Sequence, residues 1–134
     1  MLFQQALLNV GPRADGSIPE NQLKRLTDLG SWMKINSEAI YDTKPWKIPG
    51  AILADGTRVR FTQKKNSLFV ILLDQSKTKT LFLPNISIPK ESKVTQFGQR
   101  NTPLKWNSKN DGIEIILNSS QHSFASVIKI DRLP

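Results

Sequence analysis

The sequence predicts a mainly β protein: an antiparallel β-sandwich preceded by one strand–turn–helix unit of the kind left from a (β/α)8 barrel. A short apolar stretch, Leu7–Val10, is followed by Gly11-Pro12 and then by apolar residues at helical spacing. From Pro45 onward the period of the apolar residues changes to two. The strand candidates that follow are short and are separated by turn residues, which is typical of a sandwich.

The first segment, residues 1–46, reads as the last βα unit of a fold whose earlier part is missing. Leu7–Val10 is expected to be a buried strand. Ser17 is expected to cap the helix that follows, with Glu20 completing a capping box. Asn36 is expected to end that helix in a left-handed conformation. The apolar stripe of the helix consists of Leu23, Leu26, Leu29 and Met33.

The second segment, residues 47–134, is expected to form the sandwich. The continuous apolar run Leu68–Leu73 predicts a central strand that is covered on both faces. Asn110-Asp111-Gly112 predicts a hairpin turn. Two prolines predict a stiff linker at Pro45–Gly50 between the segments. Further strands are expected at residues 58–62, 80–83, 93–97, 104–106, 113–117 and 123–130.

Length and composition indicate one ordinary globular core, since the chain has 134 residues and is 38% hydrophobic. No apolar run approaches the length of a membrane span and no signal peptide opens the sequence, so we expect no membrane partner. The absence of cysteine excludes disulfides and thiolate metal sites.

The net charge of +8 raises the question of a nucleic-acid partner. The whole excess lies in residues 47–134, where the lysines are scattered over expected turns and strand ends. Such scatter is typical of solvated loops and protected strand edges. No helix or run gathers these charges, and no aromatic-glycine RNA motif accompanies them. We therefore expect no nucleic-acid partner.

Three motifs in the first segment carry a family resemblance. They read Asn-Val-Gly-Pro from Asn9, Asp-Gly-Ser-Ile-Pro from Asp15, and Gly-Ser-Trp-Met-Lys-Ile-Asn-Ser-Glu-Ala-Ile-Tyr-Asp-Thr-Lys-Pro-Trp from Gly30. Their order and spacing resemble the end of the catalytic barrel in the α-L-fucosidases of glycoside hydrolase family 29. The rest of the chain resembles the C-terminal β-sandwich module of that family. Ser37 stands where the family usually has glycine.

The resemblance implies the C-terminal part of a retaining α-L-fucosidase that removes terminal α-L-fucose without a metal or other cofactor. Residues 1–46 would then be the terminal βα unit of the barrel and residues 47–134 the accessory sandwich. The family's two catalytic carboxyl groups come from earlier barrel motifs, which this sequence does not contain. The chain alone is therefore predicted to be inactive, with no catalytic residue. Its implied partners are the missing barrel and, through the parent enzyme, fucosylated glycans.

Localisation stays open, because the family is often secreted, periplasmic or lysosomal. The alternative function is a stand-alone carbohydrate-binding sandwich, which would need an exposed aromatic platform. Without a barrel, the apolar stripe and Leu7–Val10 would lack partners, and we expect the chain to self-associate or to leave residues 1–16 loose. Trp32, Tyr41 and Trp46 are expected to pack between the helix and the sandwich.

Two residues are candidate sugar contacts. Asn9 would lie near the mouth of a barrel, where active sites form, or would cap local backbone before Gly11-Pro12. Trp106 would form a platform for a sugar ring or fill the sandwich core or its interface with the barrel. His122 is the only histidine, lies in a loop-like stretch and completes no metal site or catalytic triad.

Overall fold

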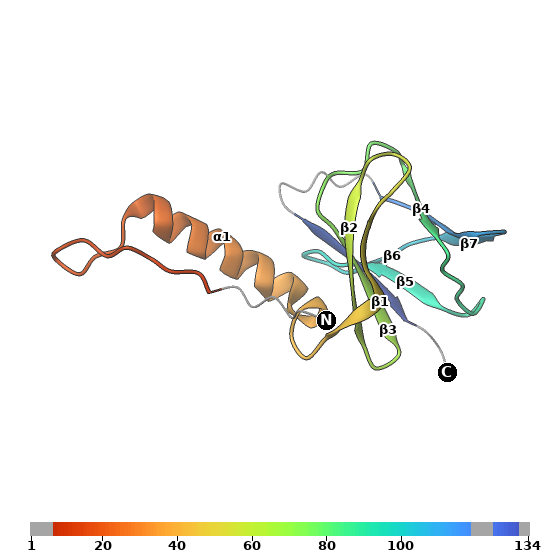
Figure 1. The fold of residues 1–134 in the computed structure, drawn as a ribbon, viewed down its shortest axis with the longest axis horizontal. Helices are drawn as coiled ribbons and strands as arrows, with labels where there is room; N and C mark the ends of the chain where they lie inside the picture. The colour runs from red at the N-terminus through yellow and green to blue at the C-terminus, as the bar shows by residue number, and fades with distance from the viewer. Residues whose placement is uncertain (1–6, 119–124, 132–134) are drawn as a thin grey trace. The chain divides into compact units, whose positions relative to one another are not determined.

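In residues 7–118 and 125–131, which the computed structural model describes, one α-helix precedes two antiparallel β-sheets (Figure 1). This arrangement confirms the predicted fold class. The chain divides into two compact units, Met1–Lys34 and Ile35–Pro134. His122 and the loop expected around it lie outside the described residues.

The strand predicted at Leu7–Val10 is wrong, because these residues are in neither a strand nor a helix and Leu7 is 88% exposed. A strand needs a hydrogen-bonded neighbour, and none of the described strands pairs with this segment. Helix α1 follows at Glu20–Asn36. Its predicted left-handed end is also wrong, since Asn36 has φ −114° and ψ 4° and the chain continues into the 3₁₀ turn η1, Ser37–Ala39.

The start of α1 differs from the predicted capping box. The helix begins at Glu20, and the Pro19 carbonyl accepts the Leu23 N–H at 2.9 Å. Ser17 lies before this point and is engaged elsewhere: its hydroxyl donates to Asp15 Oδ1 at 2.7 Å and its N–H donates to the same oxygen at 2.9 Å. These bonds form a local Asp turn and hold the pKa of Asp15 below its usual value.

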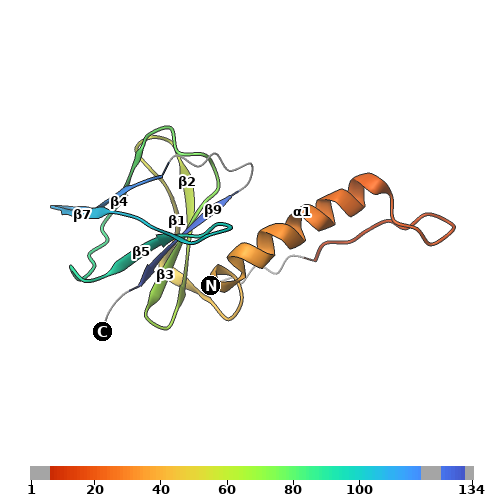
Figure 2. The same ribbon diagram turned by 180° about the vertical axis from the view of Figure 1, so that it is seen from behind.

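The described strands form a six-stranded and a three-stranded sheet (Figure 1; Figure 2). The larger sheet has the order β1 (Lys44–Ile52), β2 (Arg58–Lys64), β3 (Ser67–Leu72), β9 (Ser126–Asp131), β5 (Lys93–Gln96) and β6 (Thr102–Pro103). The smaller sheet has the order β4 (Thr80–Pro84), β8 (Gly112–Ile116) and β7 (Trp106–Lys109). All neighbouring strands are antiparallel.

Most predicted strands are present, and the exceptions have local causes. Leu68–Leu72 is buried throughout in the interior strand β3, and the predicted hairpin joins β7 to β8 through Asn110 and Asp111. The predicted strand at 104–106 is wrong, because the buried Leu104 lies between β6 and β7. Pro45–Gly50 belongs to β1 and not to a linker. Its prolines are tolerated because β1 is an edge strand whose register shifts between Pro45 and Gly50.

Apolar side chains between the two sheets form the main core. The Trp46 ring joins this core, with its centroid 5.3 Å from that of Phe61. The prediction that Trp46 packs between helix and sandwich is wrong, since Trp46 is a sandwich core residue. Tyr41 is 61% exposed on the sandwich unit, and its packing against the helix stays a prediction. Trp32 is half-buried. The fully buried core members are Val59, Leu68, Val70, Leu83, Ile113, Ile115, Ile128 and Ile130.

Candidate functional site on the outer face of the six-stranded sheet

A second set of buried side chains lies outside the main core. Along β3, Leu68, Val70 and Leu72 belong to the main core, so the alternate residues Phe69 and Ile71 point to the opposite face of the sheet. Both are nevertheless buried. We call this face the outer face. Its buried set, the outer-face cluster, consists of Ala39, Phe69, Ile71, Phe97 and Val127.

Register and ring contacts connect the members of the outer-face cluster. Ile71 of β3 is paired with Val127 of β9, so their side chains are neighbours on one face. The rings of Phe69 and Phe97 meet edge to face, with centroids 6.2 Å apart. An exposed sheet face would not bury these residues, so this face is covered by other parts of the chain.

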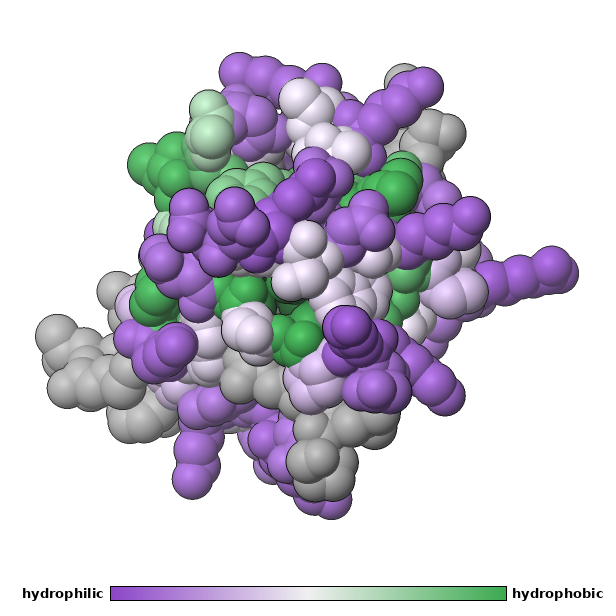
Figure 3. Space-filling view, turned by 90° about the vertical axis from the view of Figure 1, so that its right-hand side faces the viewer, coloured by the Kyte–Doolittle hydropathy of each residue, from purple (hydrophilic) through white to green (hydrophobic). Residues whose placement is uncertain are grey.

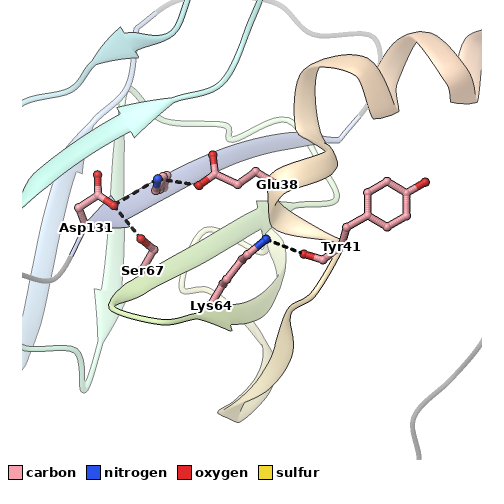
Figure 4. A network of polar contacts seen from close by, with 6 residues as sticks. Glu38, Tyr41, Lys64, Ser67 and Asp131 are labelled. Atoms are coloured by element: carbon pink, nitrogen blue, oxygen red, sulfur yellow. Dashed lines mark hydrogen bonds and ion pairs between the residues drawn. The ribbon is translucent and has the colours of Figure 1, made fainter.

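The segment after α1 is held to the outer face by backbone acceptors. Thr62 on β2 donates from Oγ1 to the Ala39 carbonyl at 2.7 Å. Lys64, on the same strand, donates from Nζ to the Tyr41 carbonyl at 3.3 Å (Figure 4). Its Nζ also lies 3.7 Å from an Asp42 carboxylate oxygen. Two side chains of β2 therefore satisfy carbonyl groups of a segment that has no strand partner of its own.

Lys129 on β9 is the centre of the polar contacts at this face (Figure 4). Its Nζ lies 2.7 Å from Glu38 Oε1 and 3.4 Å from Asp131 Oδ1. The same Nζ lies 5.9 Å from the centroid of the Phe69 ring. Ser67 donates from Oγ to Asp131 Oδ1 at 2.7 Å. Burial lowers the pKa of Lys129, but the hydrogen bond to Glu38 and the nearby carboxylates outweigh it and raise the pKa above its usual value. One ammonium group therefore balances two carboxylates.

Two carboxyl groups near the start of β2, those of Asp74 and Asp55, have lowered pKa values, whereas a general acid needs a raised pKa. The side-chain hydrogen bond from Arg58 is the main cause that lowers the pKa of Asp74 to about 2. Burial raises the pKa of Asp55, but hydrogen bonds from Thr57 and Ser76 outweigh it and leave the pKa lowered. Among residues 7–118 and 125–131, no group of three or more His, Cys, Asp or Glu side chains is placed to hold a metal ion.

The two predicted sugar contacts lie in different parts of the chain. Asn9 is exposed in the segment that forms no strand. Trp106 opens β7, is half-buried and packs against the main core, while its Nε1 donates to the Ser92 carbonyl at 3.0 Å. A sugar contact for either residue stays a prediction.

In the described part of the chain, no helix is long and apolar enough to cross a membrane.

Sequence reasoning missed Glu38 and Lys129. The two residues are 91 positions apart, and their pairing depends on where η1 lies over β9. The available signal was the alternation in β9, where Lys129 stands between the apolar residues Ile128 and Ile130 and so points away from the main core.

The fold and this site define an antiparallel β-sandwich domain whose polar contacts hold its leading segment. The Alpha-L-fucosidase family matches residues 5–38, and the Alpha-L-fucosidase C-terminal domain matches residues 55–131. The chain therefore belongs to the α-L-fucosidase family, of which it covers the C-terminal region, including the tail of the catalytic domain.

Individual relatives agree with this assignment. The chain is 37% identical over 103 residues to the Alpha-L-fucosidase of Branchiostoma floridae, covering 75% of this chain and 22% of the relative. It is 34% identical over 105 residues to the Tissue alpha-L-fucosidase of Homo sapiens, covering 78% and 22%. The chain thus spans about a fifth of the length of these curated relatives.

Solved structures agree as well. The Thermotoga maritima α-fucosidase in complex with a mechanism-based inhibitor superposes with a TM-score of 0.81 at 32% identity, over 94% of this chain and 30% of that one. The same enzyme in complex with fucose gives a TM-score of 0.79 at 32% identity, over 92% and 29%.

Proposed function

We propose that this chain is the C-terminal portion of a retaining α-L-fucosidase and serves that enzyme as a structural, non-catalytic module. Residues 1–46 would close the catalytic barrel and residues 47–134 would form the accessory sandwich. Retaining hydrolysis of an α-L-fucoside requires two carboxyl groups about 5–5.5 Å apart on either side of the bond that breaks. The rest of the barrel would supply them. Two adjacent matches, to the catalytic family and then to its C-terminal domain, support this order.

The observation that carries the structural role is the outer face of the large sheet. Lys129, Thr62 and Lys64 all contact the segment 38–42, which leads from α1 into β1. Their polar groups are occupied by protein partners and hold the connecting segment on the sandwich. A fixed connection is what a module needs if it is to support the barrel to which it is attached.

The alternative, a stand-alone carbohydrate-binding sandwich, requires an exposed aromatic platform, for which Trp106 is the candidate. The indole N–H of Trp106 is bonded to Ser92 and the ring packs on the core, which is the arrangement of a packing residue. Those contacts favour the structural module over a platform at this position.

The apolar stripe of α1 fits a helix that a barrel would cover. Leu23 and Leu29 are 50% and 47% exposed. We propose that this stripe drives self-association of the isolated chain, because apolar side chains at helical spacing gain by leaving water. Sedimentation should show association that weakens in Leu29→Lys. A monomer at every concentration would refute this.

Sequencing the transcript upstream of the Met1 codon tests the proposed parent. We expect an in-frame coding sequence for the earlier strands of the barrel, with its two catalytic carboxylates. An in-frame stop codon directly upstream, with initiation at Met1, would contradict the proposal and leave an independent sandwich protein.

A further inference from the structure

We propose that the three-stranded sheet carries a binding site for a neutral saccharide, with the Phe82 ring as its platform. The hollow at this site has a volume of about 490 Å³. Its lining residues are Phe82, Ser108, Lys109, Asn110, Asp111 and Glu114. This site rests on the geometry of β4, β7 and β8 and is independent of the proposed parent enzyme.

The strand register brings Phe82 to the solvent face. Leu81 and Leu83, its neighbours on β4, are buried in the main core, so Phe82 points to the other side of the sheet, where it is 38% exposed. Phe82 is paired with Glu114 of β8, and Glu114 is paired in turn with Asn107 of β7. An aromatic ring, a carboxylate and an amide therefore form one row across the sheet.

The lining has the mixed chemistry that sugar hydroxyl groups require. Lys109 and the Asn110 amide supply N–H donors, while Asp111 and Glu114 supply carboxylate acceptors. Each hydroxyl of a sugar both donates and accepts, so it can use both kinds of partner. The exposed ring of Phe82 offers an apolar surface for the C–H face of a pyranose.

The charges favour a neutral ligand over an ion. Lys109 Nζ lies 3.5 Å from Glu114 Oε1, so these two charges are already paired. An anion would meet the carboxylates of Asp111 and Glu114, and a small cation would meet the ammonium group of Lys109. A ring with uncharged hydroxyl groups encounters neither penalty.

The hollow is shallow and lies among polar groups. Figure 3 views the side of the molecule on which Figure 1 shows β4 and β7, and there the apolar patches are broken up by hydrophilic side chains. An open site of this kind predicts weak binding, with a Kd on the order of 1 mM.

A titration of the complete 134-residue chain tests the site. The probe is 2′-fucosyllactose, followed by amide chemical shifts in the isotope-labelled protein. We expect saturable shifts at residue 82 and at residues 108–114. Phe82→Ala and Phe82→Leu should each weaken binding roughly tenfold, since both remove the ring. Ile116→Ala is the matched control, because Ile116 is similarly exposed at 39% on the same small sheet, and its Kd should stay within about twofold.

Circular dichroism of each variant separates lost binding from lost folding, and Phe82→Leu keeps apolar bulk if the alanine variant unfolds. The proposal is overturned if no saturable shift appears with 2′-fucosyllactose, lactose or maltose. Shifts centred on the Trp106 indole would also overturn it and would move the sugar contact to β7. Equal weakening by Ile116→Ala would assign the effect to the sheet as a whole and refute a role for the Phe82 ring.

Discussion

Replacing Lys129 by methionine removes the ammonium group at the outer face and keeps most of its apolar stem. The side chain of Lys129 is 21% exposed, and it contacts Glu38, Asp131 and the ring of Phe69. In the variant, Glu38 and Asp131 lose their shared countercharge. Of the polar contacts described for the segment that follows α1, those from β2 would remain.

The loss of stability in Lys129→Met should lie between that of a buried charged hydrogen bond and that of an exposed ion pair. A hydrogen bond to a charged group contributes about 1.5–3 kcal/mol when it is buried, whereas an exposed ion pair contributes about 0.2–1 kcal/mol. Lys129 is mostly buried, but Glu38 is 47% exposed, so water compensates part of the loss. We therefore expect Lys129→Met to lower the free energy of unfolding by about 1–2 kcal/mol.

Urea denaturation of the full chain, followed by tryptophan fluorescence, measures this change. Lys90→Met is the matched control because Lys90 is exposed, and its effect should stay within about 0.5 kcal/mol. A double-mutant cycle with Glu38→Gln should give a coupling energy of at least about 0.5 kcal/mol. A stabilising role for the Lys129 ammonium group is refuted if Lys129→Met lowers the free energy of unfolding no more than Lys90→Met does, or if the effects at positions 38 and 129 simply add.

Three further predictions concern glycines, acid and activity. Gly112→Ala should lower the free energy of unfolding in urea by about 1–3 kcal/mol, because the added Cβ would lie 2.1 Å from the Leu83 carbonyl oxygen. Gly30→Ala in α1 is the comparison, since its Cβ would meet nothing within 4 Å and should increase the helical ellipticity. Equal changes in stability for the two variants would contradict this prediction. Arg58 lowers the pKa of Asp74 to about 2, so this carboxylate stabilises the fold above its unfolded pKa near 4 and the benefit disappears as the pH falls towards 2. Urea midpoints of wild type and Asp74→Asn should therefore differ at pH 7 and converge at pH 2, and a constant difference would count against the pairing. The chain alone should release no nitrophenol from 4-nitrophenyl α-L-fucopyranoside, and steady turnover that follows the protein through purification would disprove the non-catalytic role.

The sandwich was predictable because its strands alternate between core and solvent. The run Leu68–Leu72 gave the clearest signal, since it is buried on both faces by the main core and by the outer-face cluster. Strand β1 was mistaken for a linker because Pro45 and Pro49 normally interrupt strands. The position of β1 at the sheet edge, where proline is tolerated, depends on which strands pair in the folded chain. It cannot be deduced from the local sequence of β1.

The errors at the helix have a different origin. Leu7–Val10 has the composition of a buried strand, but burial needs partners that local sequence does not supply. Ser17 satisfies a capping pattern, yet Asp15 is closer and takes its hydrogen bonds. Glu38 and Lys129 escaped notice because a pair so far apart in the sequence is defined by strand register, which single-residue patterns do not encode.

We propose above that this chain belongs to a larger fucosidase and is its non-catalytic C-terminal portion. Capture of the native polypeptide with an antibody against residues 35–134, followed by determination of its mass and hydrolysis of 4-nitrophenyl α-L-fucopyranoside, tests it most directly. We expect a polypeptide several times heavier than 15.1 kDa that hydrolyses the fucoside. A 15.1 kDa polypeptide without hydrolytic activity would contradict it.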